Sequence, residues 1–133
     1  MSLEKNPIES SENRALLCAK AVIDKSAENI KIFNLTGRSG FTGYFVICSG
    51  SSDRKVQAIS DSVSELMESS GATLVSTEGY TEGRWVLMDF GDVVVHIFLD
   101  ALRDYYDLDR LWADAPQVKI PPQYYAPAAT RTN

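Results

Sequence analysis

A hairpin signal at residues 84–99 constrains the fold more than any other part of the chain. Two runs of β-branched, aromatic and aliphatic residues flank the pair Gly91-Asp92. A two-residue loop that opens with glycine is typical of a type II′ β-hairpin. The sequence therefore predicts two antiparallel strands that are joined at Gly91 and Asp92.

Both faces of the predicted hairpin are apolar. Because side chains alternate along a strand, one face carries Phe90 opposite Val93, Met88 opposite Val95, and Val86 opposite Ile97. The other face carries Asp89 opposite Val94, Leu87 opposite His96, and Trp85 opposite Phe98. A solvated antiparallel face is normally polar. We therefore expect both faces to be covered, by helices of this chain or in part by a partner protein.

Composition narrows the class of partner. The 133 residues suit one domain. Thirteen Lys and Arg residues against eighteen Asp and Glu residues give a formal charge of −5, without a cluster of basic residues. Binding to nucleic acid depends on clustered cations, so we expect no direct nucleic-acid binding. A basic protein surface is the more natural partner.

The distribution of apolar residues also bears on location. The sequence contains no apolar run near the ~20 residues that a membrane helix needs. The first residues lack the apolar core of a signal peptide. We therefore expect a cytoplasmic protein without a membrane partner.

Periodicity predicts the elements that precede the hairpin. Apolar residues at three- and four-residue spacing predict helices over residues 16–27 and 56–67. Alternation predicts a strand over 30–35, and an unbroken apolar run predicts a doubly buried strand over 44–48. A further strand is predicted over 73–76. Its place after a strand and a helix predicts a parallel crossover.

The predicted domain spans residues 14–115. We expect a flexible arm over residues 1–13 and a disordered tail over 116–133, where prolines replace any periodicity. After the hairpin, Asp100 is a candidate cap for a last helix, whose imperfect periodicity allows a new turn at Asp107. The fold class is α/β, with a five-stranded mixed β-sheet flanked by helices.

The turn at residues 49–53 joins a predicted strand to a predicted helix. Free N–H groups at such a helix start can hold an anion. Serine and aspartate also cap helices routinely, and capping is the favoured interpretation.

The pair Gly50-Ser51 within this turn also matches the opening of a nucleotidyltransferase active site. That site needs an Asp-x-Asp pair on a nearby strand to bind magnesium, and residues 73–77 contain no acid. Asp89 and Asp92 lie across a turn, where we expect them to diverge. We keep a magnesium-dependent nucleotidyltransferase-like enzyme, which would use Ser51 with Asp89 and Asp92, as the alternative hypothesis.

His96 and the two cysteines are predicted to pack in the core. His96 is the only histidine, which argues against a multi-histidine metal site, and Asp89 is a candidate partner for its ring. Cys18 and Cys48 lie thirty positions apart and form no C-x-x-C motif. We expect them to be reduced core residues.

Trp85 is a candidate for either core or interface, and the residues alone favour neither. A large aromatic residue on a strand is usually buried, whereas interfaces are enriched in tryptophan and tyrosine. Phe90 lies beside the turn, where full burial is difficult, so we expect it to lean towards an interface.

Three segments in order resemble the Iojap family, the ribosomal silencing factors. They are residues 44–52, 84–98 and 105–112, and the likeness extends over about 15–115. The stretch Gly-Asp-Val-Val-Val-His after the tryptophan makes the resemblance specific.

The resemblance implies a nucleotidyltransferase-like fold that lacks the catalytic acids, and a protein without enzyme activity, cofactor or metal. It implies binding to the large ribosomal subunit through its protein fourteen, a block of subunit joining when nutrients are short, and a homodimer. The implied contacts are Trp85, Phe90, Asp89 and Asp92.

The sequence differs from the family pattern after the last strand, where the family often has two adjacent acids and residues 99–101 are Leu-Asp-Ala. Phe90 joins the face of Trp85 only if the turn breaks the alternation. A purely structural dimerisation domain is a third hypothesis.

Overall fold

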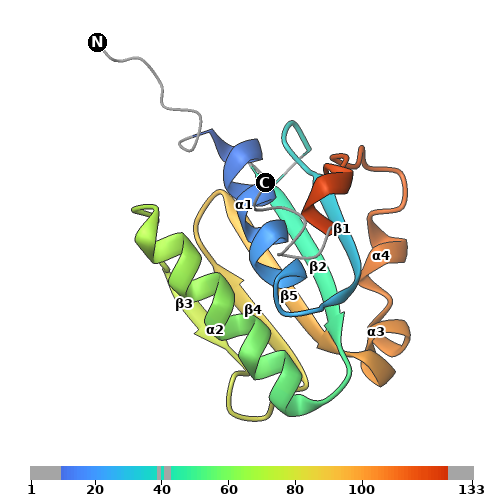
Figure 1. Ribbon diagram of the computed structural model, residues 1–133. Helices are drawn as coiled ribbons and strands as arrows, with labels where there is room; N and C mark the ends of the chain where they lie inside the picture. Colours follow the sequence, from blue (N-terminus) through green and yellow to red (C-terminus); the bar gives the residue numbers. More distant parts are fainter. Residues whose placement is uncertain (1–9, 39, 41–42, 126–133) are drawn as a thin grey trace.

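The computed structural model describes residues 10–38, 40 and 43–125. Within them, one mixed sheet has the order β1-β2-β5-β4-β3, with bounds β1 Glu28–Asn34, β2 Tyr44–Gly50, β3 Ser76–Glu78, β4 Trp85–Asp89 and β5 Val93–Leu99 (Figure 1). β2 and β5 are parallel, and the other neighbours are antiparallel. The predicted α/β fold with a five-stranded mixed sheet is confirmed.

The β4–β5 hairpin has the predicted register. All five paired positions agree: Trp85 with Phe98, Val86 with Ile97, Leu87 with His96, Met88 with Val95, and Asp89 with Val94. The Phe90 N–H donates to the Val93 carbonyl at 2.9 Å, which closes the loop. Gly91 has φ +93°, a conformation that favours glycine. The hairpin places β5 in the centre of the sheet, between β4 and β2.

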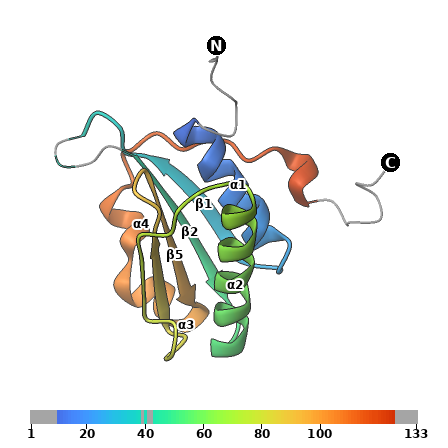
Figure 2. The same cartoon turned by 90° about the vertical axis from the view of Figure 1, so that its left-hand side faces the viewer.

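Helices lie on both sides of the sheet. α1 (Ser11–Ile23) and α2 (Asp53–Ser69) cover one face, whereas α3 (Asp100–Tyr106) and α4 (Leu108–Leu111) lie on the other (Figure 2). The C-terminal part of the described chain then crosses to α1, where the short 3-10 helix η2 (Pro122–Tyr125) ends it. The two faces of the sheet are therefore covered by elements of very different length.

Serine caps begin both long helices. The Ser10 side chain accepts a hydrogen bond from the Asn13 N–H, and the Ser52 side chain accepts one from the Lys55 N–H, each at 3.1 Å. Such caps satisfy backbone donors that the helix itself leaves free. The capping interpretation of the turn at residues 49–53 is confirmed.

The main core lies between the sheet and the two long helices. Its buried side chains include those of Val22, Val46, Ile59, Val63, Val95 and Ile97. Cys18 and Cys48 are free thiols within this core, as predicted. Burial raises the pKa of each thiol to about 12, so both are protonated at neutral pH.

A smaller cluster lies on the opposite face. Its buried members are Phe33, Leu35, Ile47, Phe98 and Ala115, against which Phe45, Trp85, Leu108 and Trp112 pack while partly exposed. α3 and α4 contribute few apolar groups to this face because they span only 7 and 4 residues. This side of the sheet is therefore covered incompletely.

Two predicted boundaries before the hairpin are revised. The arm predicted over residues 1–13 is too long, because Ser10 caps a helix that begins at Ser11; residues 1–9 lie outside the described part. The strand predicted over 73–76 is placed too early, because β3 begins at Ser76 and ends at Glu78. Its apolar pattern reflects Ala72 and Leu74, which pack against the core as the chain leaves α2. The strand pairings make β3 parallel to β2, but β5 and β4 lie between them.

The predicted disordered tail is wrong for residues 116–125. The Asn34 N–H donates to the Pro116 carbonyl at 2.8 Å, and the Val118 N–H donates to the Ile32 carbonyl at 2.9 Å. Val118 and Ile120 pack against the main core. Prolines remove periodicity, yet this segment is ordered because it pairs with the edge of β1. Residues 126–133 lie outside the described part.

The last helix divides where the sequence allowed a new turn. Asp107 adopts a left-handed conformation with φ +50° and separates α3 from α4. The prediction that Asp100 caps this helix is wrong, because Asp100 is its first residue and Leu99 holds the cap position without a side-chain bond.

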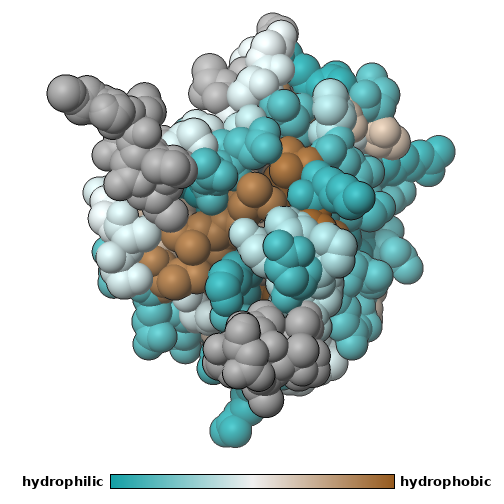
Figure 3. Space-filling view, turned by 45° about the horizontal axis from the view of Figure 1, so that its top comes forward, coloured by the Kyte–Doolittle hydropathy of each residue, from teal (hydrophilic) through white to brown (hydrophobic). Residues whose placement is uncertain are grey.

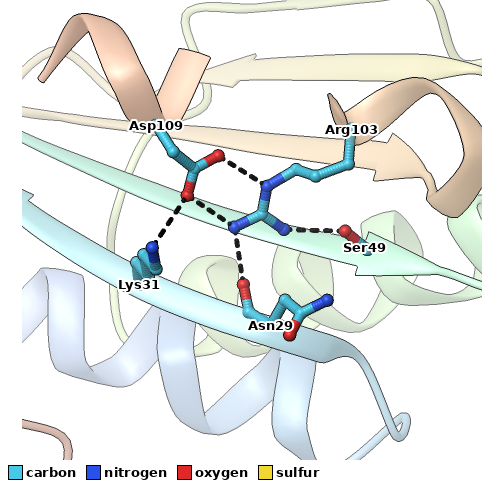
Figure 4. Close-up of polar contacts among 5 residues, drawn as sticks. All are labelled: Asn29, Lys31, Ser49, Arg103 and Asp109. Carbon is cyan, nitrogen blue, oxygen red and sulfur yellow. Dashed lines mark hydrogen bonds and ion pairs between the residues drawn. The ribbon is translucent and has the colours of Figure 1, made fainter. Parts of the chain in front are cut away.

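Arg103 joins the two short helices to the sheet (Figure 4). Its guanidinium donates to both carboxylate oxygens of Asp109 in α4, at 2.7 Å from Nε and 2.9 Å from Nη2. It also donates to Ser49 Oγ on β2 at 2.7 Å and to the Asn29 carbonyl on β1 at 2.8 Å. The Arg103 hydrogen bond holds the pKa of the Asp109 carboxyl below its usual range, and Lys31 acts in the same direction. Four elements therefore meet at one buried cation.

Removal of the Arg103 charge is expected to destabilise the fold strongly. Arg103 is only 6% exposed, and Arg103→Met leaves the Asp109 carboxylate without its main partner. The expected loss is about 3 kcal/mol in the free energy of unfolding. Urea denaturation monitored by circular dichroism measures it.

The matched control is Arg110→Met in α4. The Arg110 side chain is 85% exposed, and its ion pair with Asp107 spans 3.9 Å. Such a pair contributes about 0 to 1 kcal/mol. Equal losses for the two variants would contradict the central role of Arg103.

Candidate functional site

An apolar surface made mostly of aromatic rings lies on the sheet side opposite α1 and α2, and we call it the aromatic face. It comprises Phe45, Trp85, Leu87, Val94, Tyr106 and Trp112, all of them partly or largely exposed. β2, β4 and β5 supply the sheet residues, whereas Tyr106 ends α3 and Trp112 follows α4. An apolar surface that contains several aromatic residues is typical of a protein interface.

Trp85 lies in the middle of these rings. Its ring stacks on Phe98 with centroids 4.8 Å apart, and Tyr106 packs against it at 4.7 Å. Tyr105, which is 78% exposed, makes an edge contact with Tyr106 at 5.1 Å. Trp85 is therefore packed from beneath and from the side, while part of its indole stays exposed. The structure thus shows Trp85 partly packed against the smaller cluster, and its role in an interface stays a prediction.

His96 lies beneath the aromatic face and is 4% exposed. The Trp85 indole Nε1–H donates to His96 Nδ1 at 3.2 Å, and the Phe45 ring lies 4.7 Å from the imidazole. The prediction that Asp89 orients this ring is wrong, because Asp89 bonds the turn instead. The packed core role predicted for His96 is confirmed. Burial lowers the pKa of His96 to about 4, so the imidazole is neutral at pH 7.

Asp89 and Asp92 diverge, as predicted. Asp89 Oδ1 accepts a hydrogen bond from the Gly91 N–H at 2.7 Å. Asp92 instead contacts α1, where it accepts from Ser11 Oγ at 2.6 Å and pairs with Arg14 at 3.3 Å. The two carboxylates therefore serve different parts of the fold.

Phe90 is a core residue, so its predicted place in an interface is wrong. It is 4% exposed and belongs to the main core, on the side of α1 and α2. Strict alternation continues to the end of β4, so Phe90 and Trp85 occupy opposite faces. The start of α1 reaches the loop at Asp92, and Phe90 lies in the same buried cluster as the apolar residues of α1.

The Gly50-Ser51 turn has a packing explanation. A Cβ on Gly50 would lie 3.0 Å from Val56 Cγ2 and 3.2 Å from Ile59 Cδ1, so the absence of a side chain here lets the end of β2 pack closely on α2. Ser51 is exposed. Across the described ranges, no group of three or more His, Cys, Asp or Glu side chains is placed to hold a metal ion. No helix in the described part is long and apolar enough to cross a membrane.

Sequence reasoning did not assign three members of the aromatic face to a binding surface. Phe45 lies in a run whose continuous apolar character predicts burial on both faces, yet it is partly exposed. Leu87 and Val94 follow the hairpin register, but the register does not reveal how far α3 and α4 reach. For Tyr106 and Trp112, the signal in the sequence was the aromatic content of residues 105–112.

The stability of the protein is expected to fall between pH 6.5 and pH 4. The folded state keeps His96 neutral down to about pH 4, whereas an unfolded histidine binds a proton near pH 6.5. The contribution of neutral His96 to the free energy of unfolding is therefore complete above pH 6.5. It declines as the pH falls, by about 3 kcal/mol at most. Urea denaturation at a series of pH values measures how the free energy of unfolding changes with pH.

A His96→Phe variant serves as the comparison, because it cannot titrate. Its stability should vary less over the same interval. The Asp109 contribution is lost at lower pH, since its pKa lies below the usual aspartate value. Identical pH profiles for the two proteins would contradict the neutral buried state of His96.

Comparisons of the sequence with known proteins point to one family. The family model described as "Ribosomal silencing factor during starvation" matches residues 8–133. The chain is 45% identical over 100 residues to Ribosomal silencing factor RsfS of Bacillus subtilis, covering 75% of this chain and 85% of that protein. It is 41% identical over 111 residues to the protein of the same name from Halalkalibacterium halodurans, covering 84% and 95%.

A solved structure supports the fold over nearly the whole chain. An X-ray structure of a Chromobacterium violaceum protein superimposes with a TM-score of 0.75 at 31% identity, covering 93% of this chain and 99% of that one. The family match includes all three segments that carried the resemblance, and it extends beyond them to residues 8–133. The chain therefore belongs to the family of ribosomal silencing factors.

Proposed function

We propose that this protein binds large-subunit ribosomal protein fourteen through the aromatic face and so blocks the joining of the small and large subunits. Translation would be repressed in this way when nutrients are short. The observation that carries the proposal is the incompletely covered sheet face with Trp85 at its centre. Membership of the ribosomal silencing factor family supports the same activity.

The aromatic face has the chemistry of a binding surface. Its tryptophans, Tyr106 and Phe45 are large amphipathic or apolar groups that are already packed against a folded sheet. Because these side chains are already held in place, they lose little conformational entropy when a partner covers them. Interfaces typically derive most of their affinity from a few such residues near the centre.

Charge favours a basic partner. The chain carries a net charge of −5. Asp89 lies at the end of β4 on the side of Trp85, and within the described residues it forms no ion pair. We propose Asp89 as the acidic contact at the edge of the interface. Asp92 is less suited to this role, because Arg14 and Ser11 already engage it, and buried Phe90 is not a contact.

The proposed role needs no chemical step. Binding over a wide apolar surface is sufficient to prevent a second ribosomal subunit from approaching the same place. The arrangement of Gly50, Asp89 and Asp92 offers no observation that favours nucleotidyl transfer, because the glycine serves packing and the two acids diverge.

We also propose that the chain forms a homodimer, as the Iojap resemblance implies. A second apolar area lies on the other side of the molecule: Figure 3 shows a hydrophobic strip on the side that α1 and α2 occupy, surrounded by polar surface. Leu16, Leu17 and Leu66 are partly exposed apolar residues of these helices. Sedimentation equilibrium of the purified protein measures the oligomeric state.

Trp85→Glu is expected to weaken binding to large ribosomal subunits by about thirtyfold or more, which corresponds to ~2 kcal/mol. The carboxylate would be desolvated in an apolar interface without a partner. Co-sedimentation of the protein with purified large subunits through a sucrose gradient measures binding. Small subunits are then added at a magnesium concentration that permits association, and the loss of the joined peak measures the block.

Tyr125→Glu is the matched control. Tyr125 is 55% exposed in η2, beside α1 and away from the aromatic face, so this variant should bind and block like the wild type. If Trp85→Glu fails to fold, Leu87→Glu on the same face provides the second test. A wild-type protein that does not sediment with large subunits at low salt, or one that binds without reducing the joined peak, would contradict the proposal.

A further inference from the structure

Trp85 is held by three neighbours of different kinds. Phe98 stacks beneath its ring with an interplanar angle of 28°, and Tyr106 packs at a tilt of 46°. The third neighbour is His96, which accepts the indole N–H at 3.2 Å. Ring contacts tolerate sliding and a range of angles, whereas a hydrogen bond requires a particular direction. Among these neighbours, His96 alone determines which way the indole N–H points.

The position of His96 is itself fixed by the sheet. It lies on central strand β5, opposite Leu87 on β4 and beside Ile47 on β2. The imidazole packs between Phe45 and Phe98, with centroids 4.7 Å and 6.4 Å away. A side chain so confined can transmit its orientation to the residue that it bonds.

The chemistry of the imidazole makes a mere packing role costly. Because Nδ1 accepts from Trp85, the neutral ring carries its proton on Nε2. This buried Nε2 has no hydrogen-bond partner among the described residues. A buried donor without an acceptor is unfavourable, and an apolar residue like the neighbouring Val95 or Ile97 would avoid that cost. The bond to Trp85 is what the imidazole adds at this position.

We propose that His96 is a positioning residue, which holds the Trp85 indole in the orientation that a protein partner binds. This inference rests on the proposed function, because it assigns His96 a part in the same interface without contact to the partner. Preorganised side chains bind more tightly because less freedom is lost on association. The effect of His96 on binding must therefore pass through Trp85.

The first test uses the free protein and does not depend on the ribosome. The indole N–H signals of Trp85 and Trp112 are separated in ¹⁵N NMR spectra by comparison with Trp85→Phe. In His96→Phe, a ring without an acceptor, the Trp85 indole N–H should exchange with solvent at least about tenfold faster. In His96→Asn, whose side-chain oxygen can replace Nδ1 as acceptor, exchange should stay near the wild-type rate.

The second test measures binding to large subunits. His96→Phe should weaken binding by about five- to tenfold, whereas His96→Asn should restore most of the affinity. In the Trp85→Phe background, the further change His96→Phe should have no additional effect. Circular dichroism fixes a temperature at which all variants are folded, so that a loss of stability does not enter the comparison.

The outcomes separate this inference from the proposed function. If His96→Phe leaves indole exchange and affinity unchanged, or if His96→Asn binds as weakly as His96→Phe, the positioning role is overturned. If exchange responds as expected while Trp85→Phe and Trp85→Glu bind normally, the aromatic face is not the ribosome contact and both proposals fail. If His96→Phe speeds indole exchange and weakens binding, and His96→Asn restores both, the positioning role is supported.

Discussion

The fold depends on a hairpin that is apolar on both faces. β4 and β5 present Val86, Met88, Val95 and Ile97 to one side of the sheet, and Trp85, Leu87, Val94 and Phe98 to the other. One side is covered by helices of 13 and 17 residues. The other receives helices of 7 and 4 residues, which cannot cover it completely. The incompletely covered aromatic face follows from this difference in length.

Helices as short as α3 and α4 are not stable by themselves, so they require tertiary anchors. Arg103 supplies one, because its guanidinium joins Asp109, Ser49 and the Asn29 carbonyl in a single buried cluster. This cluster also fixes Tyr106, three residues further along α3, against Trp85. A polar network thus determines the outline of an apolar surface. The segment after Trp112 continues along β1 and completes the edge of the sheet.

The candidate site illustrates how far local patterns reach. The alternation of residues 84–99 predicted which side chains share a face, and it correctly separated Trp85 from Phe90. It did not predict that Phe90 is covered, because α1 comes from a distant part of the chain. The partner of His96 was also mistaken: Asp89 is used by its own turn, and Trp85 fills the place. The ordered segment 116–125 left no periodic signal because its backbone, rather than its side chains, pairs with β1.

The sequence by itself determined the hairpin, its register, the α/β class and the family, because these depend on nearest-neighbour alternation, turn chemistry and motifs at fixed spacing. The tertiary structure alone decided which of the two apolar faces stays partly exposed. That outcome depends on the length of helices fixed by an unusual Asp107 turn and on a buried ion pair between Arg103 and Asp109. It also depends on the reach of α1 over the end of the hairpin. How completely each face is covered depends on distant segments that meet in space, and local patterns do not encode that.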